Sequence, residues 1–70
     1  MTEIETQKII RDALKARKTE LERKYAEREG MPAFKSNLLE IKKAIAVLDA
    51  EIEAIEAEIA KLEAKGKPNV

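Results

Sequence analysis

The sequence predicts an all-α fold, an antiparallel, coiled-coil-like helical hairpin of two long helices that dimerises into a four-helix bundle. Between positions 38 and 62, large apolar residues recur at alternating steps of three and four: Leu38, Ile41, Ile45, Leu48, Ile52, Ile55, Ile59 and Leu62. This spacing gathers them on one stripe of an α-helix, which no β-strand can do. Gly30 and Pro32 separate the stripe from a preceding stretch that contains neither residue type and is rich in helix formers. A single 70-residue domain, residues 1–70, is therefore expected to turn once.

The first helix is expected over about residues 3–29. Thr2 and Glu5 have capping-box spacing, in which the hydroxyl accepts one free backbone N–H and the carboxylate reaches back to another. The predicted apolar face consists of Ile10, Leu14, Leu21 and Tyr25. Ile4 and Ile9 extend it unevenly. Arg17 and Lys18 interrupt this face, either laying their methylenes along the seam or forming a polar layer that specifies register.

The turn is expected at residues 30–32, because Gly30 can take the left-handed conformation and Pro32 cannot continue a helix. The second helix can restart at Pro32, or it can be capped by Ser36 or Asn37. The spacing of Met31, Phe34 and Leu38 continues the apolar repeat and favours the early restart. This predicts a second helix over about residues 32–65 and a tail over residues 66–70.

The hairpin brings Tyr25 near Phe34 and Leu38, Leu21 near Ile41, Leu14 near Ile45 and Leu48, and Ile10 near Ile52. It also places the basic run between Lys8 and Lys18 beside the acidic stretch between Asp49 and Glu58. Exposed ion pairs contribute only about 0.2–1 kcal/mol each, so this complementarity selects the antiparallel orientation more than it stabilises the fold.

Beyond Ile55, the first helix offers only Ile4 as a large apolar partner for the stripe. A second copy of the chain is the simplest way to cover what remains, because exposing each such side chain forgoes roughly 1.5–3 kcal/mol. A homodimer is therefore expected, either a four-helix bundle of two hairpins or a pair joined along their second helices. The expected dimer seam consists of Leu48, Ile52, Ile55, Ile59 and Leu62.

Composition argues against catalysis. The chain has no cysteine and no histidine, so the usual nucleophiles, general bases and zinc ligands are missing. Neither an enzyme nor a metal or other cofactor is expected. The N-terminus lacks the features of a signal peptide, and no apolar run reaches the ~18 residues that span a bilayer. A soluble cytoplasmic protein without membrane contact is the expectation.

Nucleic-acid binding is one alternative. Lys8, Arg11, Lys15 and Lys18 recur at helical spacing as a basic ridge, which a dimer would double. Small dimeric helical hairpins of the Rop type, which bind RNA, are similar in length and architecture. Against this, the net charge is zero, with 14 basic and 14 acidic residues, and the acidic second helix would neutralise the ridge. A structural or scaffolding coiled coil is a further alternative.

Recognition of a protein target is the favoured function. Residues near the turn belong to types enriched at interface centres, and the candidate partner-binding residues are Arg17, Leu21, Tyr25 and Arg28. Met31 and Phe34 could contribute, or could plug the closed end of the hairpin together with Tyr25.

The segment from Glu29 to Leu38, with a basic helix before it and Ala/Glu/Ile-rich heptads after it, resembles small uncharacterised proteins encoded by bacteriophages and prophages. The resemblance covers the hairpin as a whole and includes no catalytic or ligand motif. It implies a phage accessory protein, of a class in which small helical dimers often bind and inhibit a host or defence protein.

Overall fold

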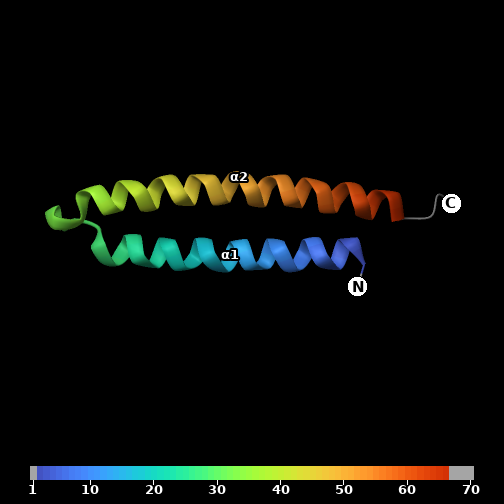
Figure 1. Ribbon diagram of the computed structural model, residues 1–70, viewed down its shortest axis with the longest axis horizontal. Helices are drawn as coiled ribbons and strands as arrows, with labels where there is room; N and C mark the ends of the chain where they lie inside the picture. Colours follow the sequence, from blue (N-terminus) through green and yellow to red (C-terminus); the bar gives the residue numbers. More distant parts are fainter. Residues whose placement is uncertain (1, 67–70) are drawn as a thin grey trace.

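Two antiparallel helices form the whole of this computed structural model, which describes residues 2–66. Helix α1 spans Glu3–Arg28, and helix α2 spans Lys35–Gly66. A short 3-10 helix, η1, spans Pro32–Phe34 between them. The helices lie side by side, with the turn at one end and, at the other, the start of α1 and the end of α2, which we call the open end (Figure 1). The predicted all-α helical hairpin is confirmed.

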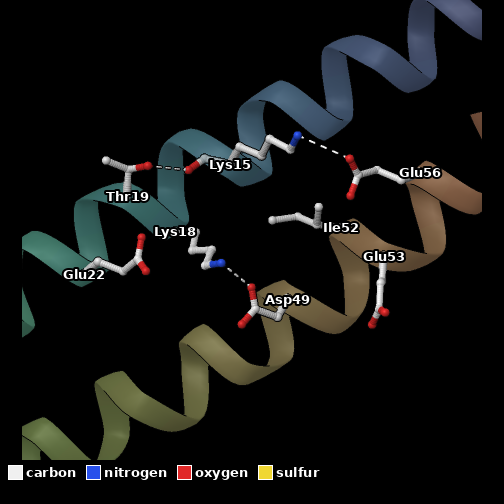
Figure 2. Close-up of a pocket in the computed structure, with 8 residues that line it drawn as sticks. All are labelled: Lys15, Lys18, Thr19, Glu22, Asp49, Ile52, Glu53 and Glu56. Atoms are coloured by element: carbon white, nitrogen blue, oxygen red, sulfur yellow. Dashed lines mark hydrogen bonds and ion pairs between the residues drawn. The ribbon is translucent and has the colours of Figure 1, made fainter.

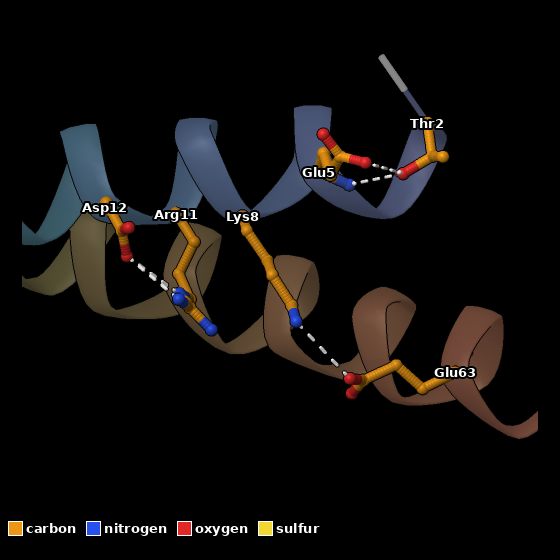
Figure 3. A network of polar contacts seen from close by, with 6 residues as sticks. All are labelled: Thr2, Glu5, Lys8, Arg11, Asp12 and Glu63. Atoms are coloured by element: carbon orange, nitrogen blue, oxygen red, sulfur yellow. Dashed lines mark hydrogen bonds and ion pairs between the residues drawn. The ribbon is translucent and has the colours of Figure 1, made fainter.

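Thr2 begins α1 as the sequence predicts, with one difference in its hydrogen bonds. The Glu5 backbone N–H donates to Thr2 Oγ1 at 3.2 Å, which satisfies one of the free donors of the first turn. The Thr2 hydroxyl in turn donates to Glu5 Oε1 at 3.1 Å. In the predicted capping box, the Glu5 carboxylate would instead accept a hydrogen bond from the Thr2 backbone N–H. Both groups still hold the first turn together (Figure 3).

Helical structure resumes at Pro32, as the early-restart alternative predicted. Gly30 has a φ of +84°, a left-handed conformation that glycine adopts without steric cost. The Glu29 N–H donates to the Tyr25 carbonyl at 2.8 Å, and the Phe34 N–H donates to the Met31 carbonyl at 3.0 Å, so helical hydrogen bonding resumes directly after Pro32. Ser36 and Asn37 lie inside α2, and the alternative in which they cap it is wrong. Helix α2 continues to Gly66, and the expected tail beyond it lies outside the described residues.

The core is the predicted stripe of α2. Ile41, Leu48, Ile52 and Ile59 are buried at 4–7% exposure, and the four remaining stripe residues are half-buried: Leu38, Ile45, Ile55 and Leu62. Long-helix packing of this kind is how a domain too small for a large globular core is stabilised.

Helix α1 meets the stripe with a mixed seam. Its half-buried residues include a set at steps of three and four: Ile4, Gln7, Arg11, Leu14, Lys18, Leu21, Tyr25 and Arg28. Ile10, which was expected to face Ile52, is 41% exposed instead, and that expectation is wrong. Arg11 takes the seam position because it lies three residues before Leu14, in phase with the heptad, and its long stem can cover apolar surface.

The open end is better covered than the sequence suggested. Ile59 is the most buried apolar residue at 4% exposure, so the expectation that it needs a second chain is wrong. Leu48 and Ile52, also assigned to the dimer seam, are buried within the single hairpin. Ile4, Lys8 and Arg11 of α1 are half-buried at this end, and long stems such as those of lysine and arginine can cover apolar surface. Ile55 and Leu62 of the predicted seam are half-buried, and the homodimer stays a prediction.

Candidate functional site

One side of the hairpin is closed by ion pairs between the helices. Lys8 Nζ lies 3.5 Å from Glu63 Oε2, Lys15 Nζ lies 3.3 Å from Glu56 Oε2, and Lys18 Nζ lies 2.5 Å from Asp49 Oδ1. We call the side that carries these three pairs the paired flank. Its lysines come from α1 and its carboxylates from α2, so the pairs join the helices between the open end and the middle of the hairpin (Figures 2 and 3).

A surface depression with a volume of about 590 Å³ lies on the paired flank. Lys15 and Lys18 reach across it to their carboxylates, Ile52 projects between them, and Glu53 points away from α1 (Figure 2). The hydrogen bond to Asp49 raises the pKa of Lys18. Because both lysines that line the depression are already paired with carboxylates of the same chain, its lining offers no free cation to an anionic ligand.

The predicted basic ridge belongs to this arrangement. Lys8, Lys15 and Lys18 form the three pairs across the helices, and Arg11 bonds to the neighbouring Asp12, with 3.0 Å between its Nη2 and Asp12 Oδ1 (Figure 3). Each cation of the ridge is therefore engaged with a carboxylate. Phosphate groups of a nucleic acid would have to displace these partners, so the structure does not favour the ridge as a nucleic-acid site.

The predicted partner-binding residues do not form one surface. Tyr25 lines a shallow groove with Lys42 and Ile45, which continues the paired flank toward the turn through Glu22. Arg17 lines a different depression with Ala44 and Val47, across the seam. We call this second side the opposite flank. The structure thus separates Arg17 from Tyr25, while Leu21 is half-buried in the seam between the helices.

Arg28 organises the turn from within. Its Nη1 donates to Asn37 Oδ1 at 2.6 Å, and its guanidinium carbon lies 5.3 Å from the centroid of the Phe34 ring. The hydrogen bond ties the last turn of α1 to the first turn of α2, and the cation–π contact holds the Phe34 ring against the guanidinium. The guanidinium is therefore already committed to contacts that build the turn.

Apolar side chains remain exposed around this turn. Met31 is 48% exposed and Phe34 is 38% exposed, so these two residues do not plug the closed end as the alternative interpretation held. Leu39 is 56% exposed and lines a groove with Tyr25, Lys35, Leu38 and Lys42. We call this five-residue surface the turn-end groove. Sequence reasoning missed Lys35 and Lys42, although their seven-residue spacing places both on the same side of α2.

The remaining ion pairs found within residues 2–66 lie on the exposed surface of α1. Among the described residues, no three acids or other ligand-bearing side chains gather where they could hold a metal ion. Arg23 donates hydrogen bonds to Glu20 and Glu27 on the exposed surface of α1, and its bond to Glu20 lowers the pKa of that carboxyl. In residues 2–66, neither helix has a stretch both long and apolar enough to cross a bilayer.

Comparisons with known proteins add no assignment. No family model, curated protein or solved structure matches this chain.

Proposed function

We propose that this protein is a non-catalytic protein-binding module that recognises its target through the turn end of the hairpin. The observation that carries the proposal is the exposed Leu39 in a groove with Tyr25, next to a second groove in which the exposed Met31 meets Lys35 and Leu38. Phe34, also exposed, lies in the same turn. Clustered exposed apolar side chains mark interaction surfaces on small soluble domains, and tyrosine, phenylalanine and methionine are enriched at interfaces.

The contacts within the turn support this proposal. Arg28 holds Phe34 and Asn37 in place, and Gly30 fixes the sharp reversal. A surface ordered before binding loses less conformational entropy when its partner arrives. The resemblance of the turn segment to phage-encoded proteins extends the proposal to an accessory protein that inhibits a host or defence protein. Within this proposal the single hairpin is the binding unit, since one chain already covers its own core.

Affinity capture with paired variants tests the proposal. The tagged protein is incubated with lysate of the cells in which it is naturally made, and retained proteins are compared with those retained by Leu39→Ser, Tyr25→Ala and Val47→Ser. Leu39 and Val47 are 56% and 57% exposed, but Val47 lies on the opposite flank, so it provides a matched control. We expect the target to be lost with Leu39→Ser and Tyr25→Ala and kept with Val47→Ser.

Circular dichroism of each variant shows whether the helices are intact. A target retained by both turn-end variants contradicts the proposed surface, and a target lost only with Val47→Ser moves the site to the opposite flank. Arg28→Ala, in which Phe34 loses its cation–π partner, is expected to weaken capture by misplacing the ring.

A further inference from the structure

The turn-end groove carries two lysines that no carboxylate of the described chain neutralises. Lys35 and Lys42 flank Leu38 and Leu39 along α2, and neither takes part in any ion pair found within residues 2–66. Tyr25 of α1 completes the groove. The surface thus combines an apolar floor with a basic rim.

The same side of the hairpin behaves differently farther from the turn. There, Lys15 and Lys18 of α1 are paired with Glu56 and Asp49 of α2. Toward the turn the order of charges reverses, because the lysines now lie on α2. Glu22 of α1 lines a depression with Lys42, but no ion pair joins the two side chains. The basic rim therefore remains available to an external carboxylate.

We propose that the turn-end groove docks an acidic amphipathic helix of a partner protein, an inference that rests on the proposed function and specifies its target. Lys35 and Lys42 are seven residues apart, which is two helical turns or about 10.5 Å. A helix lying along α2 could present carboxylates at positions i and i+7 to the two ammonium groups. Its apolar residues at i+3 and i+4 would then contact Leu38, Leu39 and Tyr25, as in other helix-in-groove complexes.

A second copy of this chain fits the groove poorly. Six of its 14 acidic residues lie on α2 from Asp49 onward, where Ile52 and Ile59 are buried. The faces that α2 leaves exposed there carry carboxylates and alanines, including Glu53, Ala57 and Ala60.

On α1 the exposed Ile9 lies between Glu5 and Asp12, but these two carboxylates are engaged within the chain by the Thr2 hydroxyl and by Arg11. Among residues 2–66, an intact second hairpin therefore lacks two unpaired acids, seven residues apart, on either side of a large exposed apolar side chain. An amphipathic helix of another protein supplies both.

The inference is tested on the full chain with synthetic helical peptides of about 18 residues, a length that supports helix formation. The acidic probe has leucines at i+3 and i+4 between glutamates at i and i+7. One control peptide replaces the glutamates with lysines, and another replaces the leucines with serines. Titration of the ¹⁵N-labelled protein, followed by NMR, reports both the affinity and the residues whose signals move.

We expect the acidic peptide to bind and to shift signals of Tyr25, Lys35, Leu39 and Lys42, while both control peptides bind at least about tenfold more weakly. The double variant Lys35→Glu/Lys42→Glu should weaken binding of the acidic peptide about tenfold or more, because two attractions become repulsions. The matched control is Lys43→Glu/Lys61→Glu, which makes the same charge change at exposed lysines of α2 outside the groove and should alter affinity less than about twofold.

Three results would overturn the inference: no shifts at the highest soluble concentration of acidic peptide, equal binding of the lysine-containing peptide, or equal weakening by the two double variants. Light scattering provides a fourth, because a dimer dispersed by Lys35→Glu/Lys42→Glu alone would identify a second copy as the occupant. If Leu39→Ser abolishes target capture from lysate while the peptide fails to bind, the proposed function stands and the acidic partner is wrong. If the turn-end variants capture the target as well as the wild-type protein does, the proposed function itself fails.

Discussion

The two ends of the paired flank are built from the same residue types but differ in how their charges are used. Toward the open end, Lys8, Lys15 and Lys18 each meet a carboxylate across the helix interface. Toward the turn, Lys35 and Lys42 meet none among residues 2–66, and the leucines between them remain accessible. Toward the open end, ion pairs and burial therefore stabilise the contact between the two helices. Toward the turn, charged and apolar side chains remain exposed, which indicates that one part of the hairpin stabilises the fold and the other is suited to binding a partner.

The largest expected effect concerns burial at the open end. Ile59→Ala should reduce the free energy of unfolding by about 2–4 kcal/mol, because it removes buried methyl and methylene groups and leaves a cavity. Ile9→Ala, at a residue that is 56% exposed, should change it by less than about 0.5 kcal/mol. Urea unfolding followed by circular dichroism measures both values.

Repeating the Ile59→Ala experiment over a range of protein concentrations shows whether one chain or two bury Ile59. If one hairpin covers Ile59, the unfolding midpoints of wild type and variant are independent of concentration. A midpoint that rises with concentration would show that a second chain contributes to the core, and would restore the dimer seam expected from the sequence.

The turn gives the next effect. Gly30→Ala should destabilise the protein by about 1–2 kcal/mol, because alanine is strained at a φ of +84° even though no atom lies within 4 Å of the added Cβ. Gly66→Ala is the control at the open end, since Gly66 ends α2 without a positive φ and has equally open surroundings. That change should be neutral or slightly stabilising in the same thermal or urea unfolding experiment. Equal changes in stability at the two glycines would show that the left-handed conformation of Gly30 does not account for the effect of the substitution.

How far the sequence predicts this structure differs between the helices. In α2, every large residue from Leu38 to Leu62 on the stripe obeys one phase, so the helix, its inward face and the hairpin follow from spacing alone. In α1, apolar residues occupy only half of the seam positions, and hydrophobicity alone favours Ile10 over Arg11, although Arg11 is the residue in heptad phase with Leu14. The turn-end groove is harder still, because Tyr25 joins Leu39 and the lysines only after the chain has reversed.

Each ion pair of the paired flank should contribute less to the free energy of unfolding than Gly30 in the turn does. A double-mutant cycle of Lys15→Ala and Glu56→Ala is expected to give a coupling free energy of about 0.2–1 kcal/mol, since both side chains are partly exposed. The same cycle applied to Glu22 and Lys42, which line one depression without an ion pair, should give a coupling near zero. Comparable couplings would remove the distinction between the two ends of the flank and would weaken the case that Lys42 is free to bind a partner.

The smallest effect is a pH dependence at the inner end of the paired flank. The hydrogen bond to Asp49 raises the pKa of Lys18 above its ordinary value of 10.5, so the folded chain holds this proton more tightly than the unfolded chain. Its contribution to stability is therefore complete below pH of about 10.5 and is lost as the pH rises through the higher folded-state pKa. The stability difference between wild type and Lys18→Gln should be constant near neutral pH and shrink above pH of about 10.5, as measured by urea unfolding. Lys43→Gln, at an exposed lysine outside the ion pairs of the described residues, gives the baseline for the general effect of losing a lysine. A difference for Lys18→Gln that persists unchanged at high pH would show that its stem, packed over the seam, and not its charge joins the helices at this point.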